Sequence, residues 1–242
     1  MPAIVQLQRA NYGSHFRTLG LRGAAELIDP FLGVDHAWMS GPTFPPHSHA
    51  GFSAVSYVFL DSEVGLANRD SLGTKNLIQP GGIHWATAGS GIVHEEVPAE
   101  PGKTVHSLQI FVNLAPQLRQ MAPSVMGLEP LEVPVVQRDG VKIRIPLGSF
   151  ADQRSPLTPP TEVTMLDISM DAGAELRLPV GAGQCLFLMP IYGMPHIDGV
   201  TYALEALRVP VYGAQADEQW ISLRAEQGAS KVVLFSGTPL QA

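Results

Sequence analysis

Apolar and polar residues alternate along many short segments of this chain, and a period of two is typical of half-buried β-strands. The segment VHSLQIFVNL shows this clearly, with Leu108, Ile110 and Val112 on one face and Gln109 on the other. The runs FSAVSYVFL and KVVLFSGTPL are rich in β-branched and aromatic residues and also predict strands. The segment APQLRQMAP predicts at most one or two helical turns, because Pro123 ends it. The pattern therefore predicts an all-β protein.

The predicted strands fall into two sets on either side of the segment MGLEPLEVPVVQRDG, residues 126–140. Proline and polar residues are frequent there, so we expect this segment to be a connector. Strands in each set recur about every 8–12 residues, which is typical of a sandwich or a barrel. We therefore expect two β-barrel domains, one over residues 1–130 and the other over residues 131–242.

The composition limits the classes of partner. The 242 residues include 24 Gly and 21 Pro but only 15% charged residues, which favours short strands joined by turns. The net charge of −7, without a cluster of Lys or Arg, argues against direct binding to nucleic acid or an anionic membrane. We expect neither a signal peptide nor a membrane span. The single Cys185 excludes an internal disulfide and fits a reducing cytoplasm.

Candidate metal ligands occur in two pairs of the same spacing. His47 and His49 lie in FPPHSHAGF, and His94 and Glu96 lie in GSGIVHEEVP. Residues i and i+2 of a strand point the same way, so each pair would project into one space. Three imidazoles and a carboxylate suit a divalent transition metal such as iron, nickel, copper, manganese or zinc. The alternative for the first pair alone is two surface histidines in a turn.

The order of the motifs is more specific than either pair. The chain reads FPPHSHAGFSAVSYVFL, then ANRDSLG, then IQPGGIHWATAGSGIVHEEVP, then VHSLQIFVNL. This order resembles the pirin family of the cupin superfamily, densely over residues 28–123 and more loosely beyond them. The resemblance implies two stacked cupin barrels, a bicupin, with iron in the N-terminal barrel and no metal in the other. The family's ligands fall on His47, His49, His94 and Glu96, the same four residues.

The resemblance implies one of two kinds of function. The first is an oxygenase of the quercetin 2,3-dioxygenase type, which acts on a flavonol or a similar enolic aromatic substrate. Fe(II) is then the first expectation for the metal, and Glu96 would accept the proton of the substrate hydroxyl. The second is a regulatory protein that binds other proteins, with a surface that depends on the redox state of the metal.

Residues around the expected ligands differ from the family pattern or have two interpretations. Phe44, Phe52 and Trp85 are expected either in the core or in the wall of the substrate pocket. His106 is expected to be a hydrogen-bonded structural residue. The chain also stops at Ala242, shortly after the family's G-x-P-L segment. Positions near the ligands that depart from the pattern are Ser48, Ala50, Ser53, Asn68 and His84. Such neighbours orient ligands and tune a metal.

Overall fold

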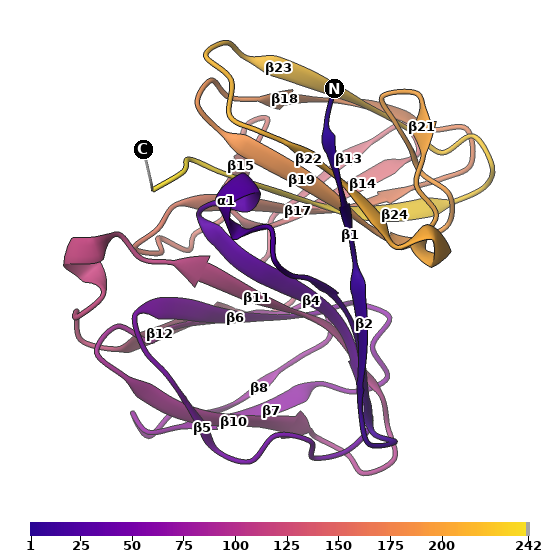
Figure 1. Cartoon of the computed structure of the whole chain (residues 1–242). Helices are drawn as coiled ribbons and strands as arrows, with labels where there is room; N and C mark the ends of the chain where they lie inside the picture. The colour runs from indigo at the N-terminus through magenta and orange to yellow at the C-terminus, as the bar shows by residue number, and fades with distance from the viewer. Residues whose placement is uncertain (241–242) are drawn as a thin grey trace.

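The computed structural model describes residues 1–240 as two stacked halves built almost entirely from β-strands (Figure 1). Each half contains one seven-stranded sheet and one four-stranded sheet. The predicted all-β fold with two cupin barrels is confirmed. The helices are limited to α1 (Ala25–Ile28) and the 3-10 turns η1 (Pro116–Leu118) and η2 (Leu204–Ala206) among these residues.

The N-terminal barrel contains eleven strands. Its larger sheet has the order β12 (Ser124–Leu128), β9 (Ile83–Thr87), β6 (Phe52–Val58), β11 (Val105–Asn113), β4 (Phe31–Met39), β3 (Phe16–Leu21) and β2 (Gln8–Tyr12). Its smaller sheet has the order β5 (His47–His49), β10 (Ile92–Pro98), β7 (Leu66–Asp70) and β8 (Lys75–Ile78).

The C-terminal barrel repeats this arrangement. Its larger sheet has the order β1 (Ala3–Gln6), β22 (Arg208–Tyr212), β19 (Cys185–Tyr192), β24 (Ser230–Gly237), β17 (Val163–Met170), β14 (Val141–Leu147) and β13 (Val135–Arg138). Its smaller sheet has the order β18 (Glu175–Val180), β23 (Gln219–Arg224), β20 (His196–Ile197) and β21 (Val200–Thr201), and β15 (Ser149–Phe150) pairs separately with β16 (Gln153–Arg154).

The first strand lies in the barrel formed by the end of the chain. Val5 in β1 pairs with Val209 in β22, and the backbone then enters the N-terminal barrel at β2 (Figure 1). Residues 126–140 also differ from the expected connector, because they include most of β12 and all of β13. Both are outermost strands of their sheets, and their partly exposed positions explain the polar composition. A division into independently folding domains near residue 130 stays a prediction.

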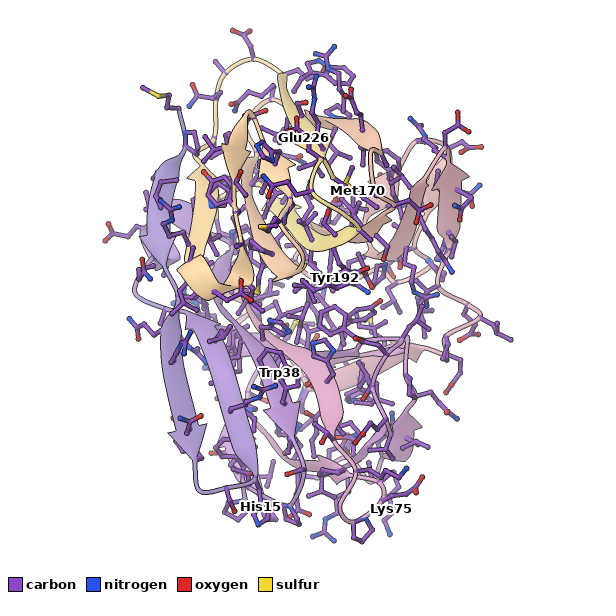
Figure 2. The ribbon with its side chains drawn as sticks, turned by 90° about the vertical axis from the view of Figure 1, so that its right-hand side faces the viewer. His15, Trp38, Lys75, Met170, Tyr192 and Glu226 are labelled. Carbon is purple, nitrogen blue, oxygen red and sulfur yellow. The ribbon has the colours of Figure 1, made fainter. Side chains whose placement is uncertain are left out.

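The two larger sheets face each other and share a hydrophobic core. Phe31 from the N-terminal barrel packs edge-on against Phe187 and Phe235 from the other barrel, with ring centroids 5.2 and 5.6 Å apart. The C-terminal barrel has a second core of its own. Figure 2 shows side chains filling both halves, with Trp38 in the N-terminal barrel and Met170 in the C-terminal barrel. No helix among residues 1–240 is long and apolar enough to cross a membrane.

Candidate metal centre

The sheet register brings the two histidine-bearing segments together. Strands β5 and β10 are antiparallel neighbours, and His47 pairs directly with His94. His47 and His49 project on the same side of β5 because they are two residues apart. The carbonyl oxygen of Pro45 lies 3.0 Å from His47 Nδ1 and holds that ring. The strand pairing therefore places three imidazoles around one point.

The three imidazoles form a compact group. One ring nitrogen from each of His47, His49 and His94 lies within 4.8 Å of the other two. His49 Nε2 and His94 Nε2 are 3.0 Å apart. Bonds from a divalent transition metal to histidine nitrogen are about 2.0–2.1 Å long, so two nitrogens on one ion lie at most about 4.2 Å apart. The His49–His94 pair meets this limit, and the rest of the group lies close to it.

The electrostatics of the group also suit a metal. Burial, and to a lesser degree the neighbouring imidazoles, lowers the pKa of His94 to about 3. The same causes lower the pKa of His49 to about 4. Both rings are therefore neutral at pH 7, and neutral imidazole is the form that binds metal. Among residues 1–240, His94 Nδ1 is buried and has no hydrogen-bond partner.

Glu96 lies two residues beyond His94 on β10 and lines the same cavity. Its carboxylate oxygens lie 2.8 and 2.7 Å from Ser56 Oγ on β6, which donates to one of them at a time because a hydroxyl has one proton. Burial raises the pKa of Glu96 to about 7, and the hydrogen bond from Ser56 opposes the rise. Glu96 can therefore hold or release a proton near neutral pH.

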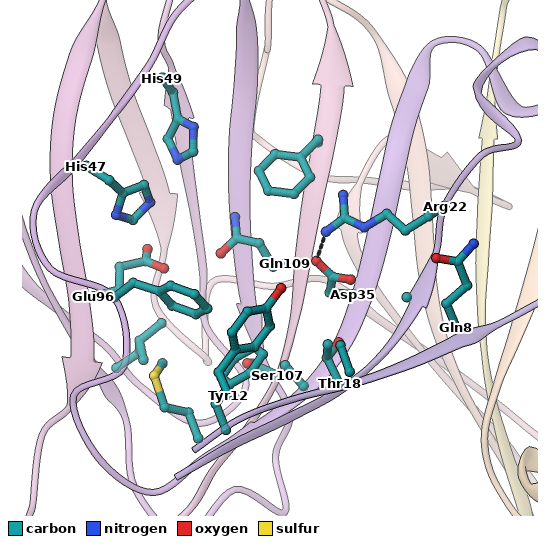
Figure 3. Close-up of a pocket in the computed structure, with 18 of the residues that line it drawn as sticks. Gln8, Tyr12, Thr18, Arg22, Asp35, His47, His49, Glu96, Ser107 and Gln109 are labelled. Atoms are coloured by element: carbon teal, nitrogen blue, oxygen red, sulfur yellow. Dashed lines mark hydrogen bonds and ion pairs between the residues drawn. The ribbon is translucent and has the colours of Figure 1, made fainter. Parts of the chain in front are cut away.

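The histidines open into a cavity of about 430 Å³, a size typical of small-molecule sites. Figure 3 shows His47, His49 and Glu96 on one side of this cavity, with Arg22 and Asp35 on the other. The hairpin of β2 and β3 forms one wall. Tyr12, Phe16 and Phe44 contribute aromatic rings, with ring centroids between 5.1 and 5.8 Å apart. The cavity thus combines a polar end with an aromatic wall.

The three aromatic residues expected in the core or the pocket have different positions. Phe44 lines the cavity. Phe52 packs against the His49 ring at 5.3 Å and the Phe111 ring at 5.7 Å. Trp85 is fully buried in the core shared by the two barrels, and its indole donates to Thr87 Oγ1 at 3.0 Å. Of the two positions expected from the sequence, the core or the pocket wall, Trp85 therefore occupies the core.

His106 lies away from the histidine group. Its Nε2 is 2.7 Å from His36 Nε2, and its Nδ1 is 2.9 Å from a carboxylate oxygen of Asp61. The ring also stacks on Trp38. These contacts agree with the structural role expected from the sequence.

Several cavity residues were not anticipated as functional. Gln109 and Phe111 on β11 line the cavity. The alternating sequence already placed Gln109 on the face opposite Leu108, Ile110 and Val112, and Phe111 shares the face of Gln109. Ser56 on β6 bonds Glu96 from a different sheet, which no local pattern indicates. Arg22 and Asp35 form an ion pair at the far end. Only knowledge of the strand register brings these residues together.

The comparisons with known proteins agree with this fold. The family profile described as Pirin matches residues 14–112. Human pirin is 31% identical over 228 residues, which make up 93% of this chain and 77% of human pirin. The chain belongs to the pirin family. Pirin-like protein 2 of Arabidopsis thaliana is 33% identical over 173 residues, 71% of this chain, and this pirin-family chain spans about half of that relative, 52%.

Solved structures resemble this pirin-family chain along its whole length. A quercetin 2,3-dioxygenase from Acinetobacter baumannii has a TM-score of 0.83 at 25% identity, covering 99% of this chain and 79% of its own. The bacterial pirin YhhW from Escherichia coli, solved in complex with nickel(II), has a TM-score of 0.75 at 18% identity. That alignment covers 99% of this chain and 100% of the other, and at this identity it supports the fold alone.

Proposed function

We propose that this pirin-family chain binds one divalent transition metal through His47, His49, His94 and Glu96. We further propose that it oxidises a small enolic aromatic compound of the flavonol type. The observation that carries the proposal is the group of three imidazoles within 4.8 Å at the wall of a 430 Å³ cavity. Fe(II) is the first expectation for the metal. Nickel is the second, because the Escherichia coli pirin was solved with nickel(II).

The chain supplies three things to such a reaction. His49 and His94 are neutral at pH 7 and offer their nitrogens to a metal without first losing a proton. Glu96 lies two residues from His94 on the wall of the cavity and is placed to accept the proton of the substrate's enolic hydroxyl. Ser56 orients that carboxylate through its hydroxyl group. When bound, the metal supplies Lewis acidity and a path for electrons to dioxygen.

The walls of the cavity suit a flat apolar ligand. Tyr12, Phe16 and Phe44 form a contiguous aromatic surface on one side, and Phe111 contributes a further ring. Aromatic walls bind planar rings and keep water from the reacting atoms. The name of the Acinetobacter baumannii neighbour, quercetin 2,3-dioxygenase, supports the choice of a flavonol as the first substrate to test.

The proposal is tested by aerobic incubation of the metal-loaded protein with quercetin and other flavonols, measuring oxygen uptake and loss of flavonol absorbance. We expect turnover that depends on the metal and is lost in His47→Ala. The regulatory alternative predicts stoichiometric metal binding without turnover of any flavonol, together with a protein partner that binds in a metal-dependent way. The assay therefore separates the two functions.

A further inference from the structure

The end of the cavity remote from the histidines contains an ion pair that the proposed chemistry does not use. Arg22 Nη2 contacts Asp35 Oδ2, and both residues line the cavity. Figure 3 shows this pair across the cavity from His47, His49 and Glu96. The ring of Phe111 separates the two ends, with its centroid 5.9 Å from that of His49 and 5.2 Å from Arg22 Cζ.

The backbone makes room for this pair. Asp35 on β4 pairs with Gly20 on β3, and a Cβ atom at Gly20 would lie 2.6 Å from Asp35 Oδ1. A Cβ atom at Gly33 would lie 3.0 Å from Arg22 Nη1. Two glycines thus leave the space that the guanidinium and the carboxylate occupy. Neither glycine has a positive φ, so the side-chain space, not backbone conformation, distinguishes these positions.

The pair has one buried member, Asp35, and one partly exposed member, Arg22. Asp35 is only 8% exposed, and burial raises the pKa of its carboxyl group although Arg22 opposes the rise. The next residues of β4 that line the cavity are Ala37 and Met39, both apolar. The Arg22 side chain is 41% exposed, so the pair is only partly buried, and such a pair contributes little net stability. A few placed polar groups in an apolar pocket, in contrast, orient a ligand.

The chemistry of the pair selects a hydroxyl group. Asp35 accepts hydrogen bonds and Arg22 donates them, and a phenolic hydroxyl does both. A carboxylate would be attracted to Arg22 but repelled by Asp35. We infer that Arg22 and Asp35 are specificity-determining residues that bind a phenolic hydroxyl on the end of the substrate remote from the metal ligands. This inference rests on the proposed function, since it assumes that a small aromatic ligand occupies the cavity.

The test compares 3-hydroxyflavone with 3,7-dihydroxyflavone and 3,4′-dihydroxyflavone, which add one hydroxyl to one or the other outer ring, so that one of them reaches the remote end of the cavity in either orientation of the ligand. Equilibrium binding to nickel-loaded protein is measured without oxygen by fluorescence titration, so turnover does not enter the readout. The wild type is expected to bind at least one dihydroxyflavone roughly tenfold more tightly than 3-hydroxyflavone, because hydrogen bonds to charged groups are strong. A site built for a hydroxyl discriminates against a ligand that lacks it.

Two variants separate the pair from the rest of the site. Arg22→Met/Asp35→Ala removes both charges together and leaves no buried carboxylate unpaired. Gly20→Ala keeps both charges but forces the Asp35 carboxylate to move. Each variant is expected to bring the preference close to one. Arg154→Met/Glu162→Ala is the matched control, since this 2.9 Å ion pair is exposed and lies in the C-terminal barrel.

The outcomes are distinguishable. If the wild type shows no preference, or if both variants fold, retain nickel and keep the full preference, the inference is wrong while the proposed function stands. A double variant that fails to fold leaves Gly20→Ala to decide, with thermal melting and nickel content as the checks. If even 3-hydroxyflavone does not bind the nickel-loaded wild type, the proposed function fails and the inference fails with it.

Discussion

The Nε2 atoms of His49 and His94 lie 3.0 Å apart, although 45 residues separate the two histidines in the chain. Burial keeps both rings neutral, and β5 and β10 hold them side by side. Neutral imidazole nitrogens at this distance can share a proton in a direct hydrogen bond, as His36 and His106 do, or bind one divalent cation. The third imidazole, His47, and the adjoining cavity distinguish this group from a structural pair.

The first prediction concerns these imidazoles. His47→Ala and His94→Ala should each lower metal affinity by at least about 10–100-fold, the usual cost of removing a group that only supports a ligand. The measurement is calorimetric titration of the metal-free protein with nickel(II). His106→Ala is the control, since His106 bonds His36 and Asp61 away from the group. If His106→Ala removes the metal as completely as His47→Ala, the ligand set is wrong.

The second prediction concerns Glu96. The substitution Glu96→Gln keeps the shape of the side chain but removes its charge, so part of the metal should remain while flavonol turnover falls sharply. The pKa of about 7 belongs to the metal-free protein, and a bound metal would keep the carboxylate charged, so the loss of turnover in Glu96→Gln should be seen across the pH range. Metal content and a pH–rate profile measured on the same samples provide the check. Full metal and full turnover in Glu96→Gln would mean that the carboxylate has neither role.

The histidine group could be predicted from the sequence because its information is local. Two residues spaced i and i+2 on a strand share a face whatever the strand pairs with. Two such pairs, His47 with His49 and His94 with Glu96, therefore indicated one site. The alternation in residues 105–114 likewise separated Gln109 from the core-facing residues before the structure was known.

The remaining features depend on register between distant strands. Asp35 pairs with Gly20 across the β3–β4 pair, and Ser56 bonds Glu96 from another sheet. Neither contact produces a periodic pattern in the sequence, so neither could be predicted from it. Trp85 has the same local pattern as a pocket residue, but its strand turns it toward the other barrel. The position of β1 in the C-terminal barrel could not be predicted either, because a strand of four residues is too short to indicate which strand it pairs with.

The third prediction is a pH dependence of stability in the metal-free protein. The folded pKa of Glu96 is about 7, above the ordinary value of 4.5, so the folded state favours the protonated carboxyl group. This contribution is fully present below about pH 4.5 and is lost as the pH rises through about 7. Relative to Glu96→Gln, wild-type protein should therefore lose on the order of 2–3 kcal/mol of unfolding free energy between pH 5 and 8.

The measurement is urea unfolding with a chelator present, at several pH values, for wild type and Glu96→Gln in parallel. Taking the difference between the two proteins removes the contribution of every other titrating group. Stability curves that stay parallel between pH 5 and 8 would show that the pKa of Glu96 is not raised in the folded protein. Adding nickel should reverse the trend, because the metal stabilises the charged carboxylate if Glu96 is a ligand.

The last prediction concerns the contact between the two barrels. On β6, Ser56 bonds Glu96 of the cavity wall, while the next residue, Tyr57, points toward the C-terminal barrel and donates to Asp167 Oδ2 at 2.7 Å. Asp167 is 1% exposed, and its other oxygen lies 3.0 Å from Lys231 Nζ. Tyr57→Phe should leave a buried carboxylate with one partner fewer, which costs about 1–3 kcal/mol of unfolding free energy.

Tyr212→Phe is the matched control for this substitution. Tyr212 also donates to a carboxylate at 2.7 Å, but its acceptor, Asp198, is exposed and lies in the same barrel, so water replaces the lost partner. The loss in the control should therefore be smaller than in Tyr57→Phe. Nickel affinity should stay unchanged in Tyr57→Phe, because successive residues of a strand face opposite ways. Equal losses of unfolding free energy in the two variants would mean that the Tyr57–Asp167 bond does not stabilise the junction between the barrels.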